Sequence, residues 1–305
     1  MCVSYEISIS DTSSLLDFID TVSDHLTATG RPGSACAYRS LAASLRRLMS
    51  GARPLGQEFV RTYAEALLRS AVCRNTLSFY MRLLRTALNR AYDAGGIDEI
   101  PAPWFRGVYT GFDRTRKRAV SVESMRRIAS VALPPDSRLA LARDIFMFCF
   151  YARGMAFVDA IMLTRDNITD RQIEYCRRKT GRRLRIGLHD KLRGIICLYS
   201  SPESVYVFPV LGGGPSAELY RSYRSALGSY NLRLKRLAAM AGVDEVLTSY
   251  TPRHSWATIA RDHDVPIKVI SEGMGHDSEL TTRIYLASIA DSEVDRANGC
   301  VADLI

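Results

Sequence analysis

The chain has 305 residues, of which 47% are hydrophobic and 24% are charged. This is ordinary globular composition, and the length fits two domains better than one. The first residues, MCVSYEISIS, have neither the basic residues nor the long apolar core of a signal peptide, and no apolar run approaches the length of a membrane span. These features argue against a secreted or membrane-spanning protein, and we expect a cytoplasmic one.

The formal net charge is +9 and the isoelectric point is near 9.3. A basic balance of this size favours an acidic partner, most often nucleic acid. A soluble protein that is merely basic would carry the same charge, so composition leaves both interpretations open. The seven cysteines are scattered, without a Cys-x-x-Cys pair or a Cys/His cluster at metal-ligand spacing. This pattern predicts buried free thiols and no metal site.

Residues 11–107 are typical of a small bundle of about four helices. Asp11 stands before an apolar run at helical spacing, as an N-cap residue would. A second helix is expected from about Ser34, and a short third one over residues 57–70. A long amphipathic helix follows from Asn75 and ends at Gly95 and Gly96.

The segment from Pro101 to Arg118 differs, because it combines proline, glycine and a cluster of basic residues. We expect an inter-domain linker here, with the linker proper over 108–118 and a second domain over 119–305. A basic linker would lie easily along a phosphate backbone, although a solvated connector has the same composition. The basic cluster consists of Arg114, Arg116, Lys117 and Arg118.

The second domain is predicted to begin with a helix over 120–133 and a long helix from about Asp136 through Leu163. A β-rich part follows, with two strands over 172–180 and 183–188 joined at Gly181, then apolar runs at 195–201 and 205–211. Helices return at 220–241, 251–262, 266–274 and 279–285. The expected fold class is therefore mainly α with a small β-sheet.

The stretch from Tyr250 to Tyr285 carries the parts of a phosphoryl-transfer site that uses no metal. The guanidinium of Arg253 can hold two phosphate oxygens at once, and the imidazole of His276 can bind a third oxygen or move a proton. The phenol oxygen of Tyr285 can attack phosphorus and hold the covalent product. Since the chain has only five lysines, Lys179 in the predicted hairpin is a further candidate.

Two motifs in this stretch resemble a known family. The segment GMGHDSELTTRIY, residues 273–285, looks like the Gly-His, Thr and Tyr box of tyrosine recombinases, the family of phage integrases and Xer-type resolving enzymes. RHSWAT, residues 253–258, resembles the family stretch directly upstream, and Lys179 matches the β-hairpin lysine. YARGMAFVDAIML, residues 151–163, resembles the branch common in Bacteroides-type mobile elements. The two C-terminal boxes are specific, whereas the match of the N-terminal bundle is only architectural.

The resemblance implies a helical, SAM-like core-binding domain followed by an α+β catalytic domain. It implies that Tyr285 forms a 3′-phosphotyrosyl bond while Arg153 and Arg253 hold the non-bridging oxygens of the scissile phosphate. Lys179 would protonate the leaving 5′-oxygen, and His276 would hydrogen-bond the phosphate or assist the tyrosine. A covalent step conserves the energy of the phosphodiester, so no cofactor, ATP or metal is expected.

Two departures from the family pattern bear on the site. Tyr250 stands three residues before Arg253, where most of the family has histidine, and its hydroxyl is a poor proton shuttle near neutrality. The usual first arginine lies three residues before an acid; here the acid is Asp159 and that position holds Ala156. Arg153 lies one helical turn earlier, on roughly the same predicted face.

The resemblance also implies the partners. Double-stranded DNA would be clamped between the two domains, and two protomers at each of two sites would form a homotetramer that exchanges strands in integration, inversion or excision. The tail after Tyr285 would pack against a neighbouring protomer. Accessory DNA-bending proteins are further candidate partners.

Two other functions remain open from the sequence. One is a non-catalytic DNA-binding regulator on the same fold, although a complete set of candidate catalytic residues argues against it. The other is a type IB topoisomerase, which uses similar chemistry without strand exchange. The recombinase-like boxes and the tail after Tyr285 favour a recombinase over both.

Overall fold

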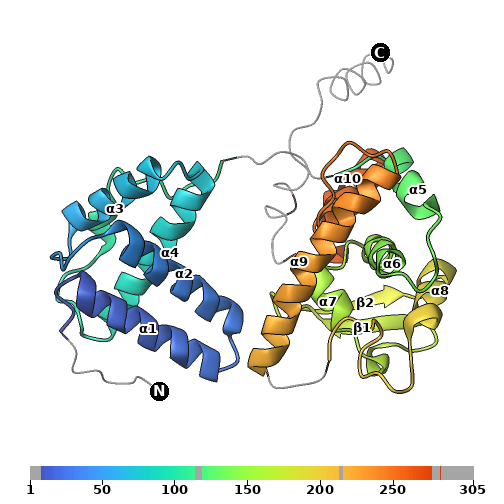
Figure 1. Ribbon diagram of the computed structural model, residues 1–305, viewed down its shortest axis with the longest axis horizontal. Coiled ribbons are helices and arrows are strands. Elements are labelled where there is room, and N and C mark those ends of the chain that lie inside the picture. Colours follow the sequence, from blue (N-terminus) through green and yellow to red (C-terminus); the bar gives the residue numbers. More distant parts are fainter. Residues whose placement is uncertain (1–7, 114–118, 213–215, 277–281, 283–305) are drawn as a thin grey trace, which may run out of the picture. The chain divides into compact units, whose positions relative to one another are not determined.

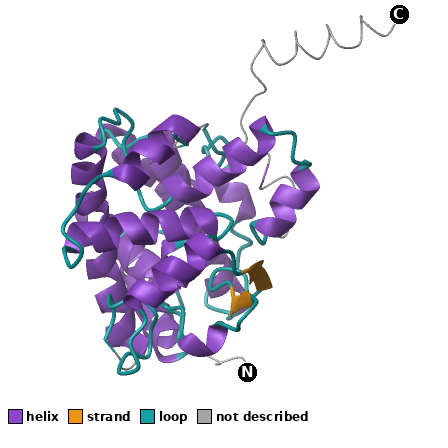
Figure 2. Cartoon of the chain, turned by 90° about the vertical axis from the view of Figure 1, so that its right-hand side faces the viewer, coloured by secondary structure: helices purple, strands orange, loops and turns teal. Residues whose placement is uncertain are grey.

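The computed structural model describes residues 8–113, 119–212, 216–276 and 282 (Figure 1). The chain divides into two compact units, residues 1–115 and 116–305. Helices dominate both units, and the described strands form one two-stranded antiparallel hairpin (Figure 2). The predicted fold class, mainly α with a small sheet, is confirmed. None of the helices in the described ranges is long and apolar enough to cross a membrane.

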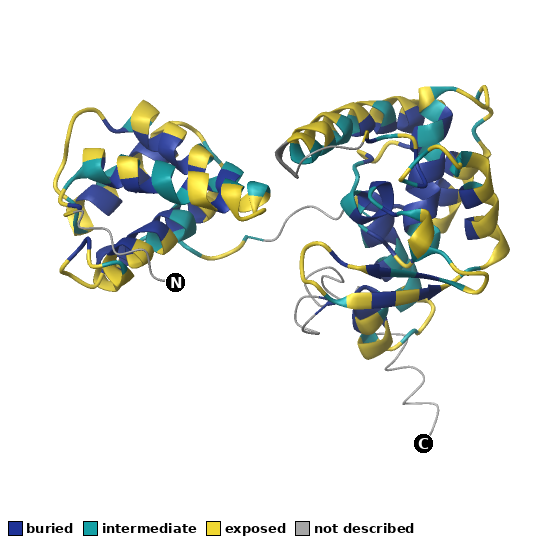
Figure 3. Ribbon diagram, turned by 90° about the horizontal axis from the view of Figure 1, so that it is seen from below, coloured by how far each residue is buried: buried dark blue, intermediate teal, exposed yellow. Residues whose placement is uncertain are grey.

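The first unit is a bundle of four helices, as predicted. They are α1 (Thr12–Ala28), α2 (Pro32–Leu48), α3 (Gln57–Arg69) and α4 (Arg74–Asp93), followed by the 3₁₀ helix η1 (Ala102–Phe105). Asp11 caps α1, because its carboxylate accepts the backbone N–H of Ser14 at 2.9 Å. Figure 3 shows the buried residues of this unit on the inward faces of its helices.

The first unit extends beyond its four helices. Trp104 and Phe105 are buried in its core, within the residues 11–107 that the sequence assigns to the first domain. Further on, Asp113 is tied to α4: its backbone N–H donates to the Asn75 side chain at 2.8 Å, and its carbonyl accepts from the same amide at 3.0 Å. The predicted basic cluster lies outside the described residues: Arg114, Arg116, Lys117 and Arg118.

The second unit is built around α6 (Arg138–Tyr151), which is apolar on nearly all sides and contacts α5, α7, α8, α9 and α10. Figure 1 shows α6 in the middle of this unit. Its other helices are α5 (Val122–Ser130), α7 (Phe157–Ile161), α8 (Asp190–Tyr199), α9 (Ser216–Met240), α10 (Thr251–Asp262) and α11 (Ile267–Gly273), with the 3₁₀ helix η2 (Arg165–Asn167).

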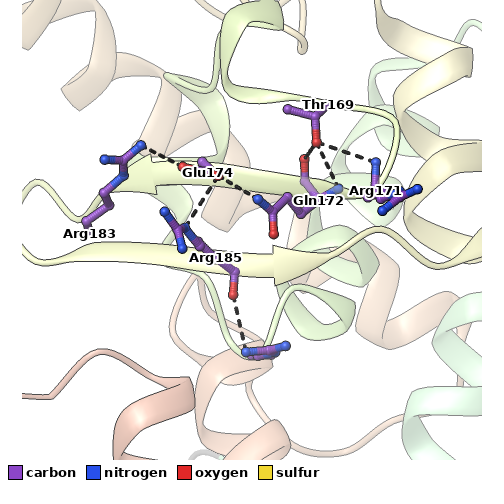
Figure 4. Close-up of polar contacts among 7 residues, drawn as sticks. Thr169, Arg171, Gln172, Glu174, Arg183 and Arg185 are labelled. Carbon is purple, nitrogen blue, oxygen red and sulfur yellow. Dashed lines mark hydrogen bonds and ion pairs between the residues drawn. The ribbon is translucent and has the colours of Figure 1, made fainter.

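The hairpin of the second unit pairs β1 (Gln172–Cys176) with β2 (Arg183–Gly187). Its outer face is charged: the carboxylate of Glu174 lies 2.7 Å from a guanidinium nitrogen of Arg183 and 3.4 Å from one of Arg185 (Figure 4). Its inner face packs into the core through Ile173, Tyr175, Leu184 and Ile186. This alternation fixes the register of the strands and hence the place of the turn between them.

Three predictions about the second unit are wrong. The long helix expected through Leu163 breaks after Tyr151, and α7 begins only at Phe157. The apolar run at 195–201 lies largely in helix α8, and the run at 205–211 forms no strand, only an isolated bridge between Thr164 and Tyr206.

The prediction that the cysteines are buried is also wrong in part. Among the described ones Cys149 is buried, whereas Cys73, Cys176 and Cys197 are exposed.

Candidate active site

Arg253 connects three segments of the second unit. It lies in the first turn of α10 and is only 2% exposed. Its Nη1 donates to the carbonyl oxygen of Gly154 at 2.7 Å, and its Nη2 donates to that of Met274 at 2.7 Å. Nη2 also lies 2.9 Å from Nε2 of His276. Two of the predicted site residues are therefore in direct contact.

His276 follows the end of α11 and is 4% exposed. The chain reaches it through Gly275, whose φ of +65° favours glycine. Any Cβ at Gly275 would come within 2.8 Å of the Leu184 side chain, so the loop presses directly on β2. The backbone N–H of His276 donates to the carbonyl oxygen of Ser271 at 3.0 Å. The Gly-His pair thus fixes the backbone at His276 against the hairpin.

Burial, together with the positive charges of the four nearby cationic side chains, lowers the pKa of His276 to about 3; these are Arg253, Arg177, Lys179 and Arg182. The imidazole is therefore neutral near pH 7. A neutral ring among four cationic side chains leaves a strongly positive site, which suits a phosphate rather than a cationic or apolar ligand.

Lys179 lies in the turn after β1 and is exposed, rather than at the end of a strand as predicted. The turn is anchored on both sides of it. Arg177 is buried, and its Nη1 donates to the carbonyl oxygen of Gly275 at 2.8 Å. Nη1 of Arg182 donates to the carbonyl oxygen of His276 at 2.6 Å. These two bonds attach the turn that carries Lys179 to the loop that carries His276.

Arg153 lies in the break between α6 and α7, with a φ of +56°, and is exposed. Its neighbour Gly154 supplies the carbonyl that Arg253 binds. The Arg153 guanidinium donates to the carbonyl oxygen of Arg185 on β2 at 3.3 Å, and its Cδ lies 3.8 Å from the Cβ position of Gly273. The structure therefore brings Arg153 to the edge of the same cluster, although not on a helix as predicted.

Tyr250 is the N-cap residue of α10 and is 45% exposed, and its ring centroid lies 6.4 Å from that of His254. It is thus held at the start of the helix that carries Arg253, with its phenol reachable from solvent. Tyr285 lies outside the described residues, as does most of the predicted helix over 279–285.

Four residues of the site were not assigned by sequence reasoning. Asp159 served in the sequence only to compare the position of Arg153 with the family pattern. In the structure its carboxylate is buried and accepts the backbone N–H of Arg178 at 3.0 Å. Burial raises the pKa of Asp159, although that hydrogen bond and the nearby arginines act against the shift. Thr282 lies 2.7 Å from Nδ1 of His276. The density of arginine around Lys179 was the available signal for the remaining two, Arg177 and Arg182.

The described residues include no group of three or more His, Cys, Asp or Glu side chains that could hold a metal ion. What the cluster offers is a set of positive donors around a neutral imidazole. Such an arrangement can bind the non-bridging oxygens of a phosphodiester and stabilise the charge that develops when it is attacked.

Two family profiles match the chain. The phage integrase SAM-like domain matches residues 14–108, and the phage integrase family matches residues 121–291. Tyrosine recombinase XerC of Alcanivorax borkumensis is 25% identical over 308 residues, covering 94% of this chain and 97% of the relative. Tyrosine recombinase XerA of Thermococcus kodakarensis is 29% identical over 181 residues, which is 56% of this chain and 58% of the relative.

Two solved structures have the same fold. A lambda integrase dimer bound to a COC′ core site has a TM-score of 0.64 and 16% identity, covering 91% of this chain and 95% of that one. The Tn1549 transposon integrase in complex with a circular intermediate DNA has a TM-score of 0.64 and 14% identity, covering 95% and 99%. Because the phage integrase profile spans more than half of the 305 residues, this protein belongs to the phage integrase family, the tyrosine recombinases that cut and rejoin DNA at specific sites.

Proposed function

We propose that Tyr285 is the nucleophile of this recombinase and that Arg253, Arg153, His276 and Lys179 surround the phosphate that it attacks. The observation that supports this assignment is the direct contact between buried Arg253 and His276, at 2.9 Å, in a cluster to which the hairpin of Lys179 is attached. Tyr285 follows Thr282 by three residues, and Thr282 contacts His276. The short separation in sequence between Tyr285 and a residue that contacts the cluster supports the proposal.

The reaction under this proposal is a transesterification. The phenol oxygen of Tyr285 forms a bond to phosphorus while the bond from phosphorus to the 5′-oxygen breaks, which leaves a 3′-phosphotyrosyl intermediate. The guanidinium groups of Arg253 and Arg153 bind the non-bridging oxygens and stabilise the added charge. The proton that Tyr285 loses is balanced by the proton that Lys179 gives to the 5′-oxygen, so the step needs no net proton, ATP or metal.

Tyr250 occupies the position before Arg253 at which most of the family has histidine. Its phenol is exposed at the start of α10, so under this proposal it donates a hydrogen bond to the bound phosphate.

We extend the proposal to the partners. The chain would act on double-stranded DNA in the cytoplasm as a homotetramer on paired sites, with or without accessory DNA-bending proteins. A lambda integrase tetramer bound to a Holliday junction supports this, since it shares the fold with a TM-score of 0.64 at 16% identity. The net charge of +9 supports a nucleic-acid partner as well.

The role of Lys179 can be tested with a substrate whose 5′-bridging oxygen is replaced by sulfur. A thiolate leaving group needs no proton near neutrality, because a thiol is a far stronger acid than an alcohol. We expect Lys179→Ala to slow cleavage of ordinary DNA by about 10²- to 10⁴-fold and to cleave the sulfur substrate at close to the wild-type rate.

Lys191→Ala is the matched control, because Lys191 belongs to α8 of the same unit and lies over the ring of Tyr151 instead. It should cleave both substrates normally. If sulfur failed to restore cleavage by Lys179→Ala, Lys179 would not be the proton donor, although a role in binding the phosphate would remain.

A further inference from the structure

Two arginines of the hairpin bind the carbonyl oxygens of two successive residues. Nη1 of Arg177 donates to the carbonyl oxygen of Gly275 at 2.8 Å, and Nη1 of Arg182 donates to that of His276 at 2.6 Å. Both are short hydrogen bonds from a charged donor, and the bond from Arg177 is buried. Lys179 lies between the two arginines in the sequence, so the turn is held on both sides of it.

The turn between these arginines is closed by its own backbone. The N–H of Arg177 donates to the carbonyl oxygen of Arg182 at 2.8 Å, and the N–H of Gly181 donates to the carbonyl oxygen of Arg177 at 2.7 Å. Gly181 has a φ of +72°, which allows the chain to reverse within so few residues. The turn is thus a compact piece of backbone, and its bonds to other segments determine where it lies. One of these is the bond from the backbone N–H of Arg178 to Asp159 at 3.0 Å.

The loop that the arginines bind is fixed independently of the hairpin. The backbone N–H of Gly275 donates to the carbonyl oxygen of Glu272 at 2.9 Å, and that of His276 donates to the carbonyl oxygen of Ser271 at 3.0 Å. These bonds attach the loop to the end of α11. The turn that carries Lys179 therefore takes its position from this loop and from Asp159.

We propose that Arg177 and Arg182 are positioning residues, which place Lys179 at the 5′-oxygen of the phosphate bound beside His276. This inference rests on the proposed function, because it requires that Lys179 gives its proton to that oxygen. The two bonds carry the position of the phosphate-binding loop over to the proton donor. A displacement of about 1 Å at a reacting group can cost about 10²-fold in rate, so a lysine on an exposed turn needs such support.

The competing role for these arginines is direct binding of a DNA phosphate. A guanidinium has five N–H donors, and each of the two carbonyl bonds uses only one of them. Burial argues against phosphate binding by Arg177, which is 7% exposed. The two roles differ in what a substitution changes. A phosphate ligand contributes to the affinity for DNA and to its salt dependence, whereas a positioning residue for Lys179 affects the step in which the proton is transferred.

DNA with sulfur at the 5′-bridging position separates the two roles. In ordinary DNA the bond from phosphorus to the 5′-oxygen breaks while the Lys179 ammonium gives its proton to that oxygen. In the sulfur substrate the bond from phosphorus to sulfur breaks and a thiolate leaves without a proton. The quantity to measure is the cleavage rate of the sulfur substrate divided by that of ordinary DNA, both at saturating protein. A variant that is partly unfolded loses both rates together, so its ratio does not change.

Arg182→Met removes the bond to the His276 carbonyl and keeps the length of the side chain. We expect it to cleave ordinary DNA about 10- to 100-fold more slowly and to raise the rate ratio by the same factor. Its Kd for DNA should stay close to the wild-type value. Arg177→Met removes the other carbonyl bond and should raise the ratio in the same direction.

Arg183→Met is the matched control, because it removes the same charge from the neighbouring position of the same hairpin. The Arg183 guanidinium lies 2.7 Å from Glu174 on the outer face of the strands (Figure 4). It contacts this carboxylate, in contrast to the carbonyl contact of Arg182. Its rate ratio should equal that of the wild type, whatever the substitution does to the affinity for DNA.

The outcomes separate this proposal from the proposed function. If sulfur restored cleavage by Lys179→Ala while the ratio stayed at the wild-type value in Arg182→Met and Arg177→Met, the positioning role would be wrong and the role of Lys179 would stand. If sulfur did not restore Lys179→Ala, the proton-donor role would fail and the positioning role with it. Should Arg182→Met fail to fold, Arg182→Lys keeps the charge with a shorter reach. It should raise the ratio by a smaller factor, and an unchanged ratio there would overturn the proposal.

Discussion

At the scale of single residues, the site depends on the buried guanidinium of Arg253 and on the backbone carbonyls that hold it. Arg253 donates to the carbonyl oxygens of Gly154 and Met274, which carry only partial charges. Burial raises the pKa of the nearby Asp159 carboxyl, and Arg253 is among the cationic groups that act against this shift. The carbonyls of Gly154 and Met274 hold the guanidinium in one orientation within the cluster, as binding a phosphate in a single geometry requires.

The neutral imidazole of His276 gives the folded protein a specific dependence on pH. The pKa of His276 is about 3 in the folded chain against an ordinary value of 6.5, so between these values only the unfolded chain binds the proton. Stability is thus fully present above the ordinary value and is lost as the pH falls from there towards 3. We expect the urea midpoint to drop between about pH 7.5 and about pH 5.5, and to drop less in His276→Gln.

Comparing the wild type with His276→Gln isolates the contribution of His276 to the pH dependence of stability. Asp159 has a raised pKa and so contributes with the opposite sign, but it is present in both proteins and its effect cancels to first order. An equal drop in wild type and His276→Gln would mean that the imidazole is not kept neutral by the fold.

Sequence spacing was enough to predict that Arg253 and His276 belong to one site, because the two lie in motifs only 23 residues apart. It could not reveal the anchoring arginines. Arg177 and Arg182 bind carbonyls that are 98 and 94 residues away along the chain, and such contacts follow from tertiary packing rather than from any local pattern. Thr282 was visible inside the motif but had no assigned partner until the ring of His276 was placed.

At the scale of elements, the break between α6 and α7 shapes the site and was not predicted. The apolar pattern continues through residues 138–163, so helical periodicity gives no sign of an interruption. Gly154 was the only local signal. The break turns Gly154 into an acceptor for Arg253, with a φ of +71° that favours glycine. The helix α8 was missed for a related reason, since its β-branched Ile195 and Ile196 also suit a strand.

Gly154→Ala tests the contact between this break and α10. A Cβ on Gly154 would come within 2.9 Å of the Arg253 Cα, a backbone atom that cannot simply rotate away. We expect a loss of roughly 2–4 kcal/mol in the free energy of unfolding of the second unit, from strain and overpacking together. This loss in the free energy of unfolding can be measured by urea denaturation.

Gly181→Ala is the matched control for strain alone. Gly181 has nearly the same φ, +72°, but nothing lies within 4 Å of its Cβ position. Its substitution should cost only about 1–2 kcal/mol. Equal losses of stability in the two variants would show that the close approach of Gly154 to Arg253 does not add to the cost of the substitution.

At the scale of the whole molecule, composition and length already indicated two domains joined by a basic segment. The compact units divide between residues 115 and 116, within the segment 108–118 whose composition changes. The sequence could not show that residues up to Asp113 are fastened to the first unit, because the bonds to Asn75 join positions 38 residues apart.

The central claim is that one tyrosine, Tyr285, carries the DNA strand during recombination. The direct measurement traps that intermediate on nicked substrates made from the DNA that flanks the gene, in which the cleaved strand diffuses away and cannot be rejoined. The wild-type chain and the control Tyr92→Phe, a change on α4 of the first unit, should form a denaturant-resistant protein–DNA adduct. Tyr285→Phe should form none. An undiminished adduct in Tyr285→Phe, or a phosphotyrosine mapped to another residue, would contradict the account.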